Sequence, residues 1–435
     1  MSSTLTTRTR APVVNDSIPN ESLDDGNPLL ANVLPVPKLS EAMRLTETHE
    51  PVDTTGWSAE EIIAHQASHT FVTNTTFGRA LMAVICQTRS SYRARDLRTE
   101  EYRDHAISAN LLLHHTAARH RREVPSRFGI APHAQRRGIL LAAPVRAGRR
   151  SFASIVESVI GRGVNVVRVP VDTGFTEYLQ LRSLRIHWPI DGKLPALGQA
   201  YLGAIDTALN TDYTARTRSP VFRERDILSW MCALGVVTNL GLLIVERINY
   251  HDAHTKAAES SWNALGELTR TTGIPVLCLA TAGATATGLA TLPGAASDLM
   301  AGGLFEVALC RSPRDRYWID ICQTIFDNTL GRVGIHTMPS WLPNAAYDLT
   351  LGYPGALASA LTSIALHLSA LKLTTITEDI FMQYGRKALE LDMPHLDAVR
   401  LIRQGGSYRA SSLLRHADWL SFAELATTHP MPELR

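Results

Sequence analysis

Apolar residues in the middle of this chain follow two alternating patterns. Short continuous apolar runs fall at residues 138–142, 164–169, 184–187, 241–245 and 275–279. Longer stretches with helical spacing fall at residues 193–209, 223–237 and 257–272. Short apolar runs are typical of buried strands, and their alternation with helices predicts a doubly wound α/β domain with a parallel sheet. We place this sheet domain at residues 131–295.

Helical patterns also lie on both sides of the sheet domain. Ser58 and Glu61 have the spacing of a capping box, and apolar residues recur near helical intervals after them. Beyond the sheet domain, helical patterns occupy residues 354–371, 377–389 and 395–403. These patterns predict a disordered tail, an N-terminal helical region, a C-terminal helical lid and a C-terminal tail, at residues 1–27, 28–130, 296–403 and 404–435.

Composition narrows the class of protein. The chain has 435 residues, 45% of them hydrophobic, and a net charge of +2, so it can bury a sizeable core and is not a polycation. Its five cysteines lack CxxC spacing, which favours free thiols in a reducing compartment. The polar N-terminus does not resemble a signal peptide, and we read no apolar run as membrane-spanning. We therefore expect a cytoplasmic protein without a membrane partner.

The first apolar run leads into a segment with the frame of a phosphate-binding loop. Residues 143–151 lie between the predicted strand at 138–142 and an amphipathic stretch at 152–160, as in the strand, loop and helix order of G-x-x-x-x-G-K-[ST]. The two glycine, the lysine and the hydroxyl positions of this frame hold Ala143, Gly148, Arg149 and Arg150. Only the last glycine is therefore retained.

A second frame is equally incomplete. Sliding the pattern by one residue makes Arg150 the lysine and Ser151 the hydroxyl, but it puts Ala147 at the last glycine. Arginine can still neutralise a phosphate, so ATP remains a candidate ligand. The hydroxyl that would hold magnesium is missing from the first frame, which argues against magnesium-dependent hydrolysis.

A second segment, about a hundred residues later, has the frame of a magnesium-binding strand. The apolar run at 241–245 ends in Glu246 and Arg247, where a working ATPase carries a metal-binding carboxylate and often a water-activating Glu. Arginine cannot accept a proton, so Arg247 cannot activate water. Thr281 follows the run at 275–279. Because ligands bind beyond the carboxyl ends of parallel strands, we expect the loop, Glu246 and Thr281 to meet at one edge.

Two further groups of residues have competing interpretations. Between residues 89 and 150 arginines outnumber acidic residues, and Arg119, Arg121 and Arg122 form the densest group. They are either solvated positions in a linker or contacts to the phosphates of DNA. His65 and His69 have the i, i+4 spacing of a zinc site, but Gln66 replaces the general base and no third ligand is evident. We therefore expect no metal site there.

Seven segments along residues 26–403 together resemble the TnsC/TniB family of AAA+ transposition regulators. The segment at 26–35 is similar to the family's NPLIEALP opening, that at 188–194 to CPHDGSLK, and that at 206–213 to DxxLGTNY. The segment at 241–248 resembles GLLVIDEI, and residues 273–281 resemble GIPVVLIGT. Residues 347–355 and 376–379 are similar to lid segments. The departures gather at the ATP site, at Ala143, Arg149, Arg150, Glu246 and Arg247.

This resemblance implies an AAA+-type P-loop NTPase fold and a role in assembly. Members of the family form oligomers on double-stranded DNA, with ATP at the subunit interfaces, and link a TniQ-like target-selection protein to a transposase. A member that has lost hydrolysis would act as a DNA-bound scaffold, as a homo-oligomer or mixed with an active paralogue. Two alternatives remain open: an active DNA-stimulated ATPase that uses Arg149 or Arg150 for phosphates and Glu246 for metal, and an α/β interaction protein without a DNA role.

Overall fold

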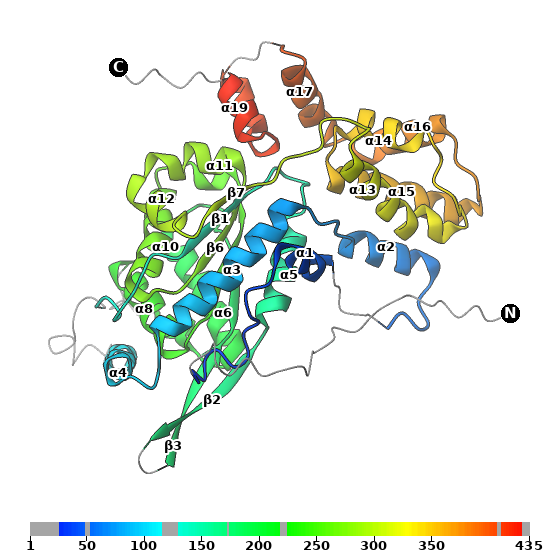
Figure 1. Ribbon diagram of the computed structural model, residues 1–435. Coiled ribbons are helices and arrows are strands. Elements are labelled where there is room, and N and C mark those ends of the chain that lie inside the picture. Colours follow the sequence, from blue (N-terminus) through cyan, green and yellow to red (C-terminus); the bar gives the residue numbers. More distant parts are fainter. Residues whose placement is uncertain are drawn as a thin grey trace.

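The computed structural model describes residues 26–47, 53–114, 129–171, 174–217, 224–406 and 410–428. A central sheet is covered by helices on both faces, and a separate group of helices lies to one side of it (Figure 1). The α/β class and the parallel sheet, with helical regions before and after it, are confirmed, as expected for an AAA+-type domain.

Five parallel strands form the main sheet, in the order β4-β5-β6-β1-β7. Their bounds are β1 Gly138–Ala142, β4 Ser183–His187, β5 Leu242–Ile248, β6 Val276–Ala280 and β7 Leu304–Glu306. β1 pairs with β6 on one side and with the short β7 on the other. The end of β1 therefore lies inside the sheet, between β6 and β7, and this is where the predicted phosphate-binding loop begins.

One predicted strand belongs to another sheet, and two strands, β3 and β7, were not predicted. The run at 164–169 forms β2 (Val164–Val171), which pairs antiparallel with β3 (Gly174–Leu181) in a separate two-stranded hairpin that projects from the domain in Figure 1. The fifth strand of the main sheet is β7, which lies past the predicted boundary at residue 295. Because β7 has only three residues and no fully buried side chain, its sequence lacks the apolar run that identifies a buried strand.

Alternating side chains of the sheet face two different cores. Ile139, Leu141 and Leu277 point to one face, where α3 (Thr75–Ala94) and α5 (Arg149–Ile160) cover them, with α1 (Leu39–Glu47) beside these helices. Leu140 and Cys278 point to the other. The helices there are α4 Glu100–His114, α6 Leu194–Leu209, α8 Glu224–Val237, α10 Ala258–Thr272 and α12 Pro293–Leu299. Burial on both faces is what a parallel sheet requires.

A third core belongs to the helical lid. Its helices are α13 Arg316–Asn328, α14 Leu342–Thr350, α15 Pro354–Leu371, α16 Glu378–Ala388 and α17 Met393–Arg403, with the short η2 Leu330–Val333. α2 (Ala59–His69) packs against α15 rather than against the sheet. The helices predicted as one N-terminal region are thus divided, because α3 covers the sheet while α2 contributes to the lid.

The remaining short elements lie at the edges of these layers. They are α7 Tyr213–Thr217, α9 Tyr250–Ala253, α11 Ala282–Thr287 and η1 Leu289–Thr291, followed near the C-terminus by α18 Ala410–Leu413, η3 Leu414–Trp419 and α19 Phe422–Thr428. The predicted C-terminal tail at 404–435 is therefore in part helical. Leu413, Ala417 and Leu420 in this segment are fully buried, since they pack into the same core as the lid.

Among the described residues, one helix is long and apolar enough, by length and composition alone, to cross a membrane. This is α15, with 18 residues and a mean hydropathy of 1.3. Ala356, Leu357, Ala360, Leu361 and Ile364 on one face of it are fully buried in the core of the lid. α15 therefore serves as the central helix of the lid.

Candidate functional site

The loop after β1 has the backbone course of a phosphate-binding loop. β1 ends at Ala142 and α5 begins at Arg149, with Gly148 as its N-cap at φ +93°. Only glycine adopts this left-handed conformation without cost, which explains why this one glycine of the motif is present. Arg146 also has a positive φ, of +65°. The loop thus turns sharply into α5, as the sequence predicted from the strand, loop and helix order.

Three amide groups of this loop, those of Ala143, Val145 and Ala147, are already engaged within the chain. The N–H of Ala143 donates to the carbonyl of Ala280 at 3.0 Å, and that of Ala147 donates to Pro144 at 3.2 Å. The N–H of Val145 donates to the backbone carbonyl of Asp418 at 2.8 Å. A phosphate-binding loop holds its ligand through such amides, so these donors are not available to a phosphate in this conformation.

Arg149, at the lysine position, points into the protein rather than toward solvent. Its guanidinium donates to Asn249 Oδ1 at 2.9 Å and to the carbonyls of Ile248 at 3.2 Å and Leu279 at 3.4 Å. Burial lowers the pKa of Arg149 to about 10, and the negative charges of Asp418 and Glu246 offset part of this effect. Arg149 therefore joins the ends of β5 and β6 and remains charged at neutral pH.

Glu246, at the magnesium-binding position, is held by the neighbouring strand. It is 3% exposed, and its carboxylate accepts hydrogen bonds from Arg185 Nη2 and His187 Nε2, each at 2.7 Å. Arg185 and His187 lie two residues apart on β4, so both side chains point to the same face. Sequence reasoning missed them, although a polar pair at alternate positions of an apolar strand was the available signal.

The remaining predicted site residues do not join one cluster. Arg150 and Arg247 are exposed, and Arg247 has a φ of +62° at an irregularity of β5. Ser151 is partly buried in the first turn of α5, and Ala143 is buried beneath the loop. Of the three arginines Arg149, Arg150 and Arg247, only Arg149 turns inward. Two of the three guanidinium groups thus reach solvent, which reduces their mutual repulsion.

Thr281 does lie at the site, and it contacts a residue that the sequence did not reveal. Its hydroxyl caps α11 by accepting from the N–H of Ala284 and donates to Asp418 Oδ1 at 2.6 Å. The same Oδ1 accepts the N–H of Tyr250, also at 2.6 Å. Asp418 belongs to η3, near the C-terminus. No local motif marks it, because its role depends on a contact across more than a hundred residues.

The helical lid is closed over the loop. The N–H of Gly355, at the start of α15, donates to the carbonyl of Arg146 at 2.8 Å. Arg146 in turn donates to Ser359 at 2.9 Å and pairs with Asp392 at 2.7 Å. The cavity beside Ala147 has a volume of only about 10 Å³. Cys310, Gly352 and Pro354 also line this cavity, so it is a small gap between the loop and the lid.

These contacts also decide whether a magnesium-bound triphosphate fits the residues present. Arg150 replaces the hydroxyl ligand, and the carboxylate of Glu246 is paired with Arg185 and contacted by His187. The residues therefore do not fit a magnesium ion.

His65 and His69 stack on each other with ring centroids 4.1 Å apart, as two packed side chains on one face of α2.

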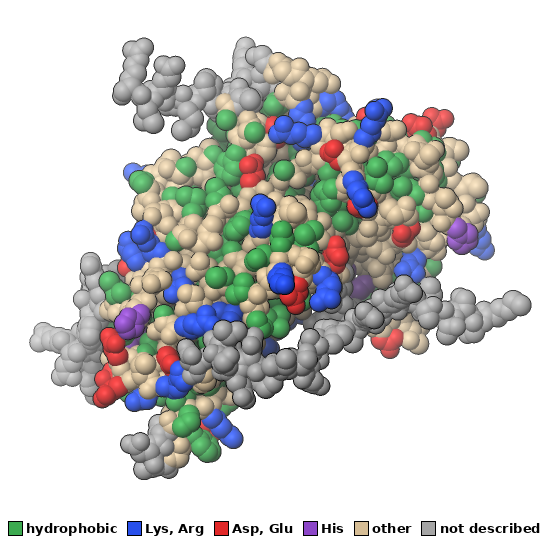
Figure 2. Space-filling view, in the orientation of Figure 1, with side chains coloured by type: hydrophobic (Ala, Val, Ile, Leu, Met, Phe, Trp, Pro, Cys, Tyr) green, Lys and Arg blue, Asp and Glu red, His purple; other side chains and the backbone are tan. Residues whose placement is uncertain are grey.

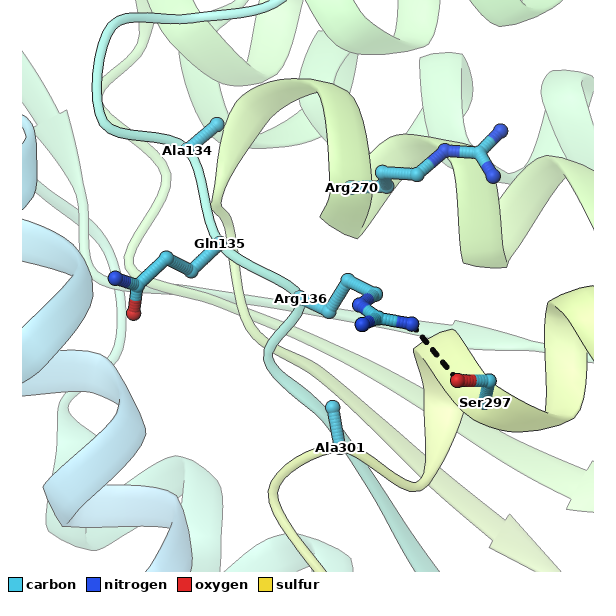
Figure 3. A pocket seen from close by; sticks show the side chains of 6 residues that line it. All are labelled: Ala134, Gln135, Arg136, Arg270, Ser297 and Ala301. Atoms are coloured by element: carbon cyan, nitrogen blue, oxygen red, sulfur yellow. Dashed lines mark hydrogen bonds between the residues drawn. The ribbon is translucent and has the colours of Figure 1, made fainter.

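A larger cavity lies at the opposite end of the sheet. It has a volume of about 570 Å³ and is lined by Ala134, Gln135, Arg136, Arg270, Ser297 and Ala301 (Figure 3). Arg136 donates to Ser297 at 2.8 Å, and both Arg136 and Arg270 approach the buried carboxylate of Asp298. The lining residues precede β1, β6 and β7, so this cavity lies at the amino ends of the strands. It is separate from the loop after β1, which lies at the carboxyl ends of the strands.

The predicted DNA contacts are placed only in part. Arg119, Arg121 and Arg122 lie outside the described residues. Arg89, Arg95 and Arg137, in the same arginine-rich stretch, are almost fully buried, and they donate to protein groups such as the carbonyls of Val33 and Leu240 and the hydroxyl of Ser90. These buried arginines therefore stabilise the fold. Basic side chains on the face shown in Figure 2 are spread among acidic ones.

Comparison with known proteins adds similarities to solved structures. No family model matches this sequence. No curated protein sequence matches it either. The Aeropyrum pernix ORC2 protein is similar in its ADPNP–ADP complexes, with a TM-score of 0.38 and 14% identity over 74% of this chain and 79% of that chain. Its ADP form has a TM-score of 0.38 and 16% identity, over 73% and 77%. A Thermotoga maritima RuvB variant has a TM-score of 0.34 and 15% identity, over 77% and 87%. At such identities the chemistry of the site is read from this chain alone.

Proposed function

We propose that this protein is an AAA+-like regulator or scaffold of DNA transposition, which assembles on double-stranded DNA without hydrolysing ATP. The transposition role and the partners, a transposase and a TniQ-like target-selection protein, rest on the resemblance of residues 26–403 to the TnsC/TniB family. The loss of hydrolysis rests on the site itself. Subunits would join as a homo-oligomer or with an active paralogue, in the cytoplasm.

The observation that carries the loss of hydrolysis is the engagement of Glu246. Its carboxylate is paired with Arg185 and His187, and the next residue is Arg247, which cannot take a proton from water. Losing a positioned base removes about two to four decades of rate in typical enzymes. ATP then serves at most as a ligand, and the output of the protein is its assembly state.

The test combines turnover with assembly. Phosphate release from ATP and magnesium should stay at background for the purified full chain, with and without duplex DNA. Sedimentation of the same samples should show larger species when DNA is added. DNA-dependent turnover on the order of one per second would support the active ATPase instead. A chain that neither binds DNA nor oligomerises would be an α/β interaction protein.

A further inference from the structure

The C-terminal segment at residues 410–428, formed by α18, η3 and α19, reaches from the lid to the carboxyl ends of the strands of the main sheet. Leu413, Trp419 and Leu420 bury their side chains in the core of the lid. On that side, Glu424 pairs with Arg403 at 2.8 Å, and the hydroxyl of Tyr353 donates to the carbonyl of Trp419. These contacts present Asp418, which lies between the buried positions, to the phosphate-binding loop.

Asp418 satisfies donors from three separate parts of the site. Its backbone carbonyl accepts the N–H of Val145 in the loop after β1 at 2.8 Å. Its carboxylate accepts the N–H of Tyr250, after β5, and the hydroxyl of Thr281, after β6, each at 2.6 Å. All three donors follow carboxyl ends of neighbouring strands, where parallel sheets bind their ligands.

The chemistry that Asp418 supplies is that of a phosphate group. It offers a negative charge and oxygen acceptors. Its charge raises the pKa of Arg149, at the lysine position of the loop, against the effect of burial. Donors that are shared with Asp418 cannot at the same time bind a triphosphate.

We propose that residues 410–428 are a built-in ligand of the phosphate-binding loop, with Asp418 in the position of a phosphate, and that a triphosphate binds only when this segment leaves. Departure of the segment frees the N–H groups of Val145 and Tyr250 and the hydroxyl of Thr281 beside Arg149. That set of donors suits a magnesium-free anion. The inference rests on the proposed function only for the class of ligand, a triphosphate.

The first test removes the carboxylate and leaves the apolar contacts of the segment in place. Calorimetric titration of the full chain with ATP in EDTA, and separately with inorganic triphosphate, compares wild type with Asp418→Ala. Asp397→Ala is the matched control, because Asp397 is an exposed acid of α17 that pairs only locally with Arg400. We expect Asp418→Ala to bind both probes at least tenfold more tightly than wild type, and Asp397→Ala to behave as wild type.

The second test displaces the same segment from a different contact. A Cβ added at Gly283 would lie 2.7 Å from the carbonyl oxygen of Ala417 and 2.8 Å from its Cβ, whereas one added at Gly294 meets nothing within 4 Å. Gly283→Ala should therefore push η3 away from the loop and raise triphosphate affinity. Gly294→Ala, the same chemical change in open space, should leave the affinity unchanged. Hydrogen exchange of residues 414–420 should rise in Gly283→Ala and not in Gly294→Ala.

Each remaining outcome overturns the inference. Equal affinity in wild type, Asp418→Ala and Gly283→Ala would mean that the segment does not compete with a triphosphate. Folded variants that bind neither probe at millimolar concentration would mean that the site has lost its ligand. Unfolding of both variants by circular dichroism would make the segment a fixed part of the core. Phosphate release by wild type overturns the proposed function, whereas equal affinities without any hydrolysis overturn this inference alone.

Discussion

Arg185 donates a 2.7 Å hydrogen bond to Glu246 from the neighbouring strand of the sheet. The arginine side chain is 18% exposed and the carboxylate 5%, so this ion pair is largely shielded from water. A carboxylate held in this way is not free to bind a metal ion. The pair lies where a working site would place its magnesium-binding acid, and in this chain it stabilises the sheet.

Removing Arg185 should destabilise the protein by about 3 kcal/mol, because breaking a buried pair leaves an uncompensated charge. His187, which also contacts Glu246 at 2.7 Å, limits the loss. Urea unfolding of Arg185→Ala measures the change. The matched control is Arg168→Ala, which removes a cross-strand Arg–Glu pair exposed on the hairpin and should cost about 1 kcal/mol or less. Equal losses of unfolding free energy in the two variants would show that the pair with Glu246 contributes no more than an exposed ion pair.

Repairing the motif alone should not restore hydrolysis. The variant Arg149→Lys/Arg150→Thr/Arg247→Glu supplies the missing lysine, hydroxyl and glutamate. Glu246 nevertheless stays paired with Arg185, and Asp418 still accepts the hydrogen bonds of its three donors. Phosphate release should therefore remain at the wild-type background with and without DNA. Turnover well above that background would mean that the substitutions in the motif, and not the surrounding contacts, block the reaction.

Closure of the lid should be sensitive to a single methyl group. A Cβ at Gly355 would lie 2.8 Å from the carbonyl oxygen of Arg146, so Gly355→Ala must move α15 away from the loop. We expect a loss of about 1–3 kcal/mol, as for other overpacked contacts. Thermal unfolding of Gly355→Ala and Gly294→Ala checks this. The second variant has space for its methyl group and should be neutral or slightly more stable.

Mild acid should loosen the C-terminal segment. His416 and His395 are joined by a 3.0 Å contact between their Nδ1 atoms, and burial lowers the pKa of both. For His395, Asp392 and Asp418 oppose this shift, while Arg415 and His251 add to it. The folded-state pKa values are below the usual value of about 6.5, so the unfolded chain takes up protons first as the pH falls. The two neutral histidines therefore stabilise the fold fully above about pH 6.5, and this contribution is lost as the pH falls below that value.

The measurement is the unfolding midpoint at pH 7 and pH 5, for wild type and for His395→Asn/His416→Asn. Wild type should lose more stability over this interval than the double variant, because the variant has lost both titrating rings. Hydrogen exchange localises the effect, and residues 414–420 should exchange faster at low pH only in wild type. Equal pH dependence of the two proteins would assign the acid sensitivity to other groups.

DNA affinity should fall steeply with salt and depend little on sequence, if the arginines near residue 120 contact phosphates. The variant Arg119→Glu/Arg121→Glu/Arg122→Glu should bind all duplexes more weakly, and the slope against log salt should fall by about 3. Arg314→Glu/Arg386→Glu/Lys387→Glu makes the same charge change at exposed positions elsewhere and should have a smaller effect. Identical binding by the two triple variants would leave only a general charge effect.

The sequence by itself predicted the elements that carry strong local signals. The apolar run at 138–142 became β1 with the predicted bounds, and the loop, α5 and the capping box of α2 followed from local spacing and turn chemistry. β2 shows the limit of such signals, because an apolar run predicts a strand but not which sheet it joins. The three-residue β7 is too short for a clear local signal, because Glu306 interrupts the apolar residues around it and its place depends on pairing with β1.

The tertiary structure alone decided the state of the site. Local sequence identified Arg149, Glu246 and Thr281 as residues near strand ends, because those ends converge in any parallel sheet. It did not reveal that Arg185 neutralises Glu246 or that Asp418 accepts the hydrogen bond of Thr281. Such partners are separated by 61 and 137 positions, and no periodicity links residues so far apart. Hydrogen bonding and burial of charge, which depend on the folded chain, determine whether this loop faces a nucleotide or the protein's own C-terminal segment.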